Sequence, residues 1–181
     1  MPESMNALAG WESFYVIVGS SGGALIGLQF VVITLIADRR HRTTTGGVSA
    51  FATPTVVHLT GALLVSAIMS APWPSARGLS VAVGMVGLAG LAYAAVVVGR
   101  ARTQTAYEPV WQDWLWYAVL PCVAYGALVV TAFFQTNTAV PLFVIGSAAL
   151  GLLLIGIHNA WDTVTHIVVS ESSDAETPHG D

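Results

Sequence analysis

Long apolar runs constrain this chain more than any other feature of its sequence. Stretches of about 20 residues or more with almost no charge occupy residues 13–37, 50–71, 78–99, 114–134 and 140–168. A helix of this length and composition matches the hydrocarbon layer of a bilayer, which is roughly 30 Å thick. We therefore predict an all-α integral membrane protein, with one domain of five transmembrane helices over residues 1–170.

The composition agrees with a membrane protein. Of the 181 residues, 55% are hydrophobic and 9% are charged, whereas a soluble domain carries roughly 25% charged residues. The basic residues are all arginine and the net charge is -4, so we expect no nucleic acid partner. Cys122 is the single cysteine, which excludes an internal disulfide and an all-thiolate metal site. Residues 171–181 are acidic and polar, and we expect a disordered tail there.

The arginines predict the orientation of the chain in the membrane. Arg39, Arg40, Arg42, Arg100 and Arg102 fall on one side of a five-helix topology, and only Arg77 falls on the other. Loops rich in arginine stay in the cytoplasm. We therefore expect the N-terminus outside and the C-terminus in the cytoplasm of a multi-pass protein, placed in the inner membrane of a bacterial-type cell.

Glycines indicate where helices approach one another closely. Gly19, Gly23 and Gly27 recur at every fourth position of the first apolar run, and such ridges of small residues let a second backbone come near. Because five short helices make a thin bundle, we expect the ridge to serve a homo-oligomer as well as packing within the subunit. We expect this ridge to be the central one, so that Gly23→Leu is more damaging than Gly84→Leu in the third run.

Two prolines bear on the helix geometry. The second helix has two readings, one with Thr53 as a cap and Pro54 at the first helical position, and one with a start near Val48 and Pro54 as an internal kink. His58 lies deeper in the membrane in the second reading. Pro121 leaves the carbonyl of Tyr117 without its usual partner, which predicts a bend in the fourth helix.

Polar residues at membrane depth gather toward the cytoplasmic side. At about 100° per residue, His158, Asp162 and His166 share one stripe of the fifth helix, and Asn159 lies beside it. Ionisable groups at this depth cost about 2.5–3.5 kcal/mol each and often serve function. We therefore predict a polar intramembrane site formed by Gln29, His58, His158, Asn159, Asp162 and His166.

The predicted site favours transport. We expect a channel or transporter for a proton, an ion or a small solute, with His58 and His158 as titrating groups, because imidazole changes charge near neutral pH. A first alternative is a non-catalytic membrane scaffold or accessory subunit, in which the polar groups hold helices together. A second alternative is a metal- or haem-binding membrane enzyme.

The second alternative has a weak basis in the sequence, and we predict no cofactor and favour a non-enzymatic role. His58, His158 and Asp162 are the residue types that bind zinc or iron, and facing histidines can hold a haem. Positions 158, 162 and 166 spread over about 12 Å of helix, so one ion would take at most two of them. A chain without lysine also excludes ATP hydrolysis by a phosphate-binding loop.

Overall fold

The structure is a computed structural model that describes residues 8, 10–40, 48–103, 111–134 and 139–176, with some side chains at helix ends left out. Within these ranges the fold is helical and contains no strand. The elements are α2 (Glu12–Arg40), α3 (Val48–Ser70), α4 (Ala76–Thr103), α5 (Trp111–Trp114), the π-helix η1 (Leu115–Val119), α6 (Leu120–Ala132) and α7 (Ala139–Glu176).

Four helical stretches in the described part of the chain are long and apolar enough to cross a membrane. They are Glu12–Leu35, Ala76–Arg100, Leu115–Ala132 and Ala139–Thr165, and Pro54–Ser70 is a shorter apolar helix. The predicted all-helical architecture with apolar, membrane-type helices is therefore confirmed.

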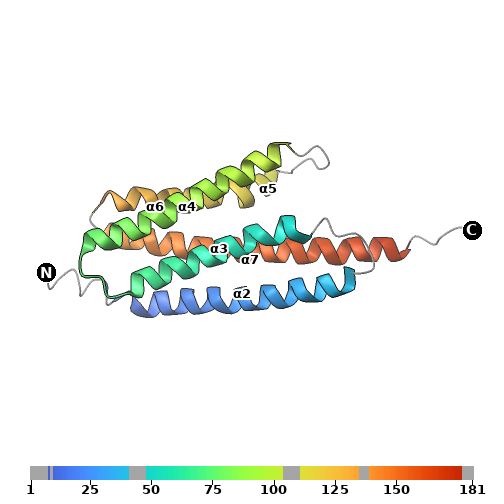
Figure 1. The fold of residues 1–181 in the computed structure, drawn as a ribbon, viewed down its shortest axis with the longest axis horizontal. Coiled ribbons are helices and arrows are strands. Elements are labelled where there is room, and N and C mark those ends of the chain that lie inside the picture. Colours follow the sequence, from blue (N-terminus) through green and yellow to red (C-terminus); the bar gives the residue numbers. More distant parts are fainter. Residues whose placement is uncertain (1–7, 9, 41–47, 104–110, 135–138, 177–181) are drawn as a thin grey trace, which may run out of the picture.

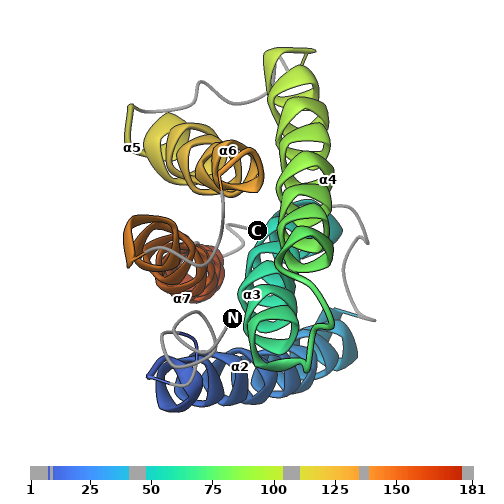
Figure 2. The same ribbon diagram turned by 90° about the vertical axis from the view of Figure 1, so that its left-hand side faces the viewer.

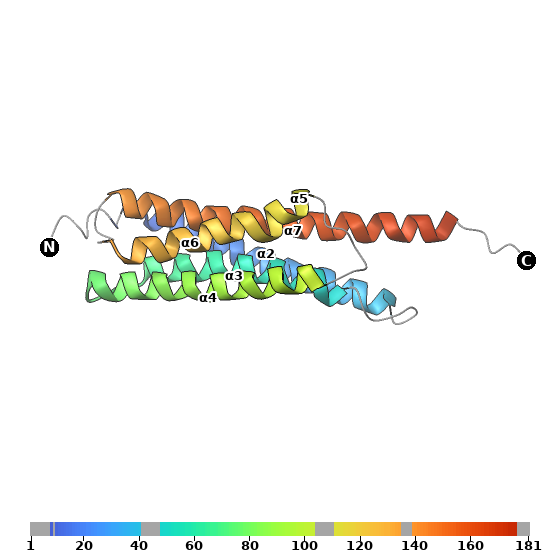
Figure 3. The same cartoon turned by 90° about the horizontal axis from the view of Figure 1, so that it is seen from above.

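The helices run up and down along one long axis (Figure 1). Seen end-on in Figure 2, α3 and α7 lie in the middle, α2 covers one side of them, and α4 and α6 cover the other. α3 is central because it packs against α2, α4 and α7. Figure 3 shows that α7 extends beyond the other helices at one end of the bundle.

The core of the bundle is apolar and closely packed. Leu59, Val65, Leu128, Ile145 and Leu152 are each at most 1% exposed. Many other large apolar side chains point outward, including Ile17, Leu28, Val81, Met85 and Val123. Such an outer surface suits lipid, where helices associate through close packing and hydrogen bonds.

The tightest helix contacts lie on α4 and not on the predicted ridge of α2. A Cβ atom at Gly84 would lie 2.7 Å from the Cβ of Ala132 in α6. On α2, a Cβ at Gly19 would lie 3.1 Å from the Cβ of Ser66, whereas Gly23 has only one loose neighbour and Gly27 has none within 4 Å. Within the chain, these contacts favour the opposite ranking, in which Gly84→Leu is more damaging than Gly23→Leu. A four-residue repeat drifts by about 40° per step around a helix, so the ridge turns away from α3.

The structure selects one of the two predicted starts of α3 and extends α7 beyond its predicted end. α3 begins at Val48 and contains Pro54, which selects the reading with an internal proline. α7 continues to Glu176 and so enters the stretch predicted to be disordered from residue 171. The sequence Glu171–Glu176 contains neither glycine nor proline, so nothing in it forces the helix to end. The remaining tail, 177–181, lies outside the described residues.

Candidate functional site

A buried histidine and two tyrosines form a polar layer where α3, α4 and α6 meet. His58 is 2% exposed and Tyr125 is 1% exposed. His58 Nδ1 and Tyr125 Oη lie 3.2 Å apart in a hydrogen bond whose direction depends on the imidazole tautomer. The ring of Tyr93 meets the His58 ring edge to face, with 6.3 Å between centroids. We call His58, Tyr93 and Tyr125 the inner layer.

Glycines on two helices make room for the inner layer. A side chain at Gly90 of α4 would overlap the Tyr125 ring, and a Cβ at Gly61 of α3 would lie 2.8 Å from Tyr125 Oη. Tyr125 therefore fits between two backbones that have no side chain at the contact. This packing aims its hydroxyl at His58, and the hydrogen bond gives both buried polar groups a partner.

Asn159 of α7 is a fully buried amide near this layer. It is 0% exposed, and neither its Nδ2 nor its Oδ1 has a hydrogen-bond partner. Gly156 of α7 faces Leu59, and Leu152 approaches Gly61, so the antiparallel register brings Asn159 to the level of the α3 turn before His58. A buried amide without a protein partner is costly. A water molecule or an ion can satisfy such a group.

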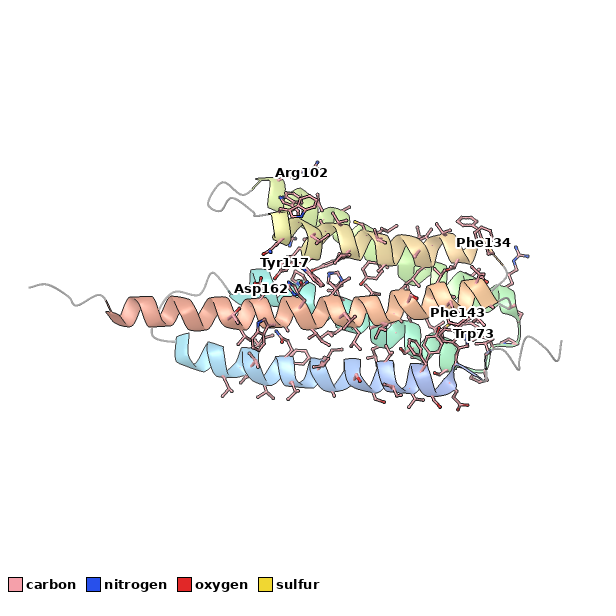
Figure 4. The ribbon with its side chains drawn as sticks, turned by 180° about the vertical axis from the view of Figure 1, so that it is seen from behind. Trp73, Arg102, Tyr117, Phe134, Phe143 and Asp162 are labelled. Atoms are coloured by element: carbon pink, nitrogen blue, oxygen red, sulfur yellow. The ribbon has the colours of Figure 1, made fainter. Side chains whose placement is uncertain are left out.

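A second group of polar contacts joins η1 to α7. The His158 imidazole stacks on the Trp116 indole, with 3.7 Å between centroids and 16° between planes. Tyr117 donates a hydrogen bond to Asp162 Oδ2 at 3.2 Å. Figure 4 shows the Tyr117 and Asp162 side chains facing one another. We call these four residues the outer layer.

The π-helix sets the geometry of the outer layer. The Leu120 N–H bonds to the Leu115 carbonyl, which is the wider turn of a π-helix. Pro121 follows directly and has no N–H to donate to the Tyr117 carbonyl. The predicted distortion before Pro121 is therefore present, as a π-turn that presents Trp116 and Tyr117 together to α7. Such turns often occur at functional sites.

The structure places the remaining predicted residues elsewhere. Gln29 is 6% exposed and lines a small apolar crevice of about 240 Å³ together with Leu59, Ala160 and Trp161. It therefore lies between α2 and α7, whereas His58 turns toward α4 and α6. The side chain of His166 lies outside the described residues.

The two histidines contact different neighbours: His58 bonds Tyr125 of α6, whereas His158 stacks on Trp116 of η1. In the part of the chain that the structure describes, no three His, Cys, Asp or Glu side chains are grouped as a metal site requires. His58, His158 and Asp162 are therefore not brought together as ligands of one ion.

Sequence reasoning missed the aromatic partners. Trp116 and Tyr117 look like ordinary residues of the membrane interface, and only the fold pairs them with His158 and Asp162. Tyr125 had a signal in the sequence, because it is a polar-tipped residue deep in an apolar run.

No protein-family model, curated protein or solved structure matches the chain. Its function is therefore argued from its own residues.

Proposed function

We propose that the chain crosses the inner membrane of a bacterial-type cell five times, with its N-terminus outside, and transports a proton, an ion or a small solute. The four long apolar helices support the membrane location. A fifth crossing by α3 is supported by its 23 residues, which make a helix about 34 Å long. The alternating direction of the five passes supports termini on opposite sides (Figure 1).

The observation that carries the proposal is the inner layer, together with the buried Asn159 amide at the level of the preceding turn of α3. The His58–Tyr125 hydrogen bond joins two groups that can give and take a proton. The amide of Asn159 offers a donor and an acceptor with no protein partner. A buried imidazole and, about one helical turn along the bundle, an unsatisfied amide are groups suited to binding a proton and a small polar species.

The packing beyond this layer favours a transporter over an open channel. α3 continues from His58 with Ala62 and Val65, which are both 0% exposed and share the core cluster with Leu128 and Ile145. A species bound near Asn159 would have to wait for helices to move before it could leave toward the opposite side. Alternating exposure of the site by helix movement meets this requirement.

Flux through reconstituted protein tests the proposal. Liposomes with a pH-sensitive dye inside are given an ion gradient, and wild-type protein should collapse it faster than empty liposomes do. His58→Leu and Asn159→Leu should abolish this flux while the helical circular dichroism and the gel-filtration profile stay unchanged. Thr60→Leu is the matched control, because Thr60 is exposed on the same helix. Flux that survives in His58→Leu, or no flux for wild type with protons, monovalent cations or divalent cations, would contradict the proposal.

A scaffold or accessory subunit is the second candidate. It is favoured by the observation that both histidines have an aromatic partner within the chain, Tyr125 for His58 and Trp116 for His158. In that case the polar groups join helices, and wild-type protein shows no flux. The single substitutions then change only stability, because there is no flux to lose.

A further inference from the structure

An apolar groove runs along the outside of the bundle between η1–α6 and α7. Its volume is about 810 Å³, and its lining includes Trp116, Ala127, Phe143, Gly151 and Leu154. Phe143 is 63% exposed and Leu154 is 53% exposed, so both face outward beside the groove. At Gly151 an added Cβ would meet nothing within 4 Å. The groove is therefore open space that faces the hydrocarbon of a surrounding bilayer.

The groove is apolar along its length but polar at one end. Trp116 lines it and also stacks on His158. The next residue, Tyr117, donates its hydrogen bond to the exposed carboxylate of Asp162. Figure 4 shows Phe143 and Asp162 well separated along α7. The apolar surface thus ends at the Trp116 indole, and the Asp162 carboxylate lies one turn of α7 beyond His158, outside the residues that line the groove.

We propose that this groove binds a lipophilic cation, with its apolar chain between α6 and α7 and its ammonium-type head against Asp162 and Trp116. Indole rings attract organic cations through their faces. An ionised carboxylate has about four acceptor positions, so Asp162 can hold Tyr117 and a cationic head together. Helix α4, which carries Arg100 and Arg102 in its last turn, does not line the groove. Binding here does not depend on the proposed transport.

The size of the groove suits a small amphiphile with one hydrocarbon chain. Its volume of about 810 Å³ lies within the usual range of small-molecule sites, roughly 300–1,000 Å³. The α7 residues that line it extend from Ala139 to Ile155, which is roughly 24 Å of helix and long enough for one extended hydrocarbon chain.

Equilibrium dialysis on purified protein in phosphatidylcholine nanodiscs tests the proposal, with empty nanodiscs as the blank. Radiolabelled dodecyltrimethylammonium should bind saturably, and dodecyl sulfate, which has the same chain and an anionic head, should not compete. Asp162→Asn should weaken binding of the cation by about fivefold or more. Gly151→Leu should abolish binding, because the new side chain fills the groove. Gly126→Leu is the matched control, since Gly126 also has open space around it but does not line the groove.

Three results would overturn the proposal. The first is equal binding by Gly151→Leu and wild type, and the second is equal competition by the cationic and anionic probes. The third is a disulfide between copies when Ser147→Cys, whose position lines the groove, is oxidised in a Cys122→Ala background. That crosslink would show the groove to be occupied by a second copy of the chain.

Discussion

At the scale of single residues, the His58–Tyr125 pair is the feature with the clearest energetic consequence. Both side chains are almost fully buried, and each is the other's hydrogen-bond partner. Removing one partner leaves the other as a buried polar group in an apolar bundle, which costs about 1–3 kcal/mol. Removing both leaves no such group, so the two substitutions cannot be independent.

We therefore expect a double-mutant cycle of His58→Leu and Tyr125→Phe to be less than additive. Hydrogen bonds between membrane helices contribute about 0.6 kcal/mol on average and up to about 1.7 kcal/mol, and the coupling energy should lie in that range. Reversible denaturation in mixed micelles measures it. His58→Leu combined with Ser20→Ala, on the exposed face of α2, should be additive. Additivity of the His58 and Tyr125 changes would mean that their hydrogen bond does not join the helices.

At the scale of helices, the joint between α4 and α6 depends on positions that lack a side chain. Gly84, Gly87 and Gly90 lie against Ala132, Val129 and Tyr125, so any Cβ there must displace α6. This α4–α6 contact also supports the inner layer, because Gly90 lies against the ring of Tyr125, which is hydrogen-bonded to His58. On α2, by contrast, Gly27 has no neighbour within 4 Å.

The substitutions Gly90→Ala and Gly27→Ala should therefore differ in their effect on the stability of the protein. Gly90→Ala forces overlap with Tyr125 and should destabilise by about 1–3 kcal/mol. Gly27→Ala reduces the conformational freedom of the unfolded chain and causes no clash in the helix, so it should be neutral or stabilising by up to about 1 kcal/mol. Thermal unfolding followed by circular dichroism compares them. A large loss of stability for Gly27→Ala would contradict this expectation and would place that face of α2 against another copy of the chain.

At the scale of the whole molecule, the arrangement of passes determines which polar groups share one side of the membrane. Figure 4 shows Arg102 of α4 and the Tyr117–Asp162 pair in the same half of the bundle, away from Trp73 and Phe134. In the proposed orientation, the arginine bias of the sequence assigns this end to the cytoplasm. Both the inner and the outer layer then lie in the cytoplasmic half of the bundle.

Cysteine labelling tests this topology. In a Cys122→Ala background, a cysteine at Thr44 should react with a membrane-impermeant maleimide only after the cells are opened. A cysteine at Ser75, in the turn before α4, should react in intact cells. The reverse pattern would invert the topology, and labelling of both positions from outside would remove the α3 crossing.

The sequence by itself determined the all-helical class, the apolar character of the helices and their approximate extent. Length and hydrophobicity are local properties, so apolar runs near 78–99 and 140–168 predicted α4 and α7 without knowledge of their neighbours. It also identified His58 and Asn159 as unusual, because polar groups in apolar runs need a reason.

Only the tertiary structure decided what those residues contact. A helix that is apolar on every side carries no polar stripe to show which face turns inward. Its rotation and its register follow from packing, such as the fit of Tyr125 between Gly61 and Gly90. That packing gave His58 its partner in α6, left Asn159 without one, and turned Gly23 and Gly27 outward.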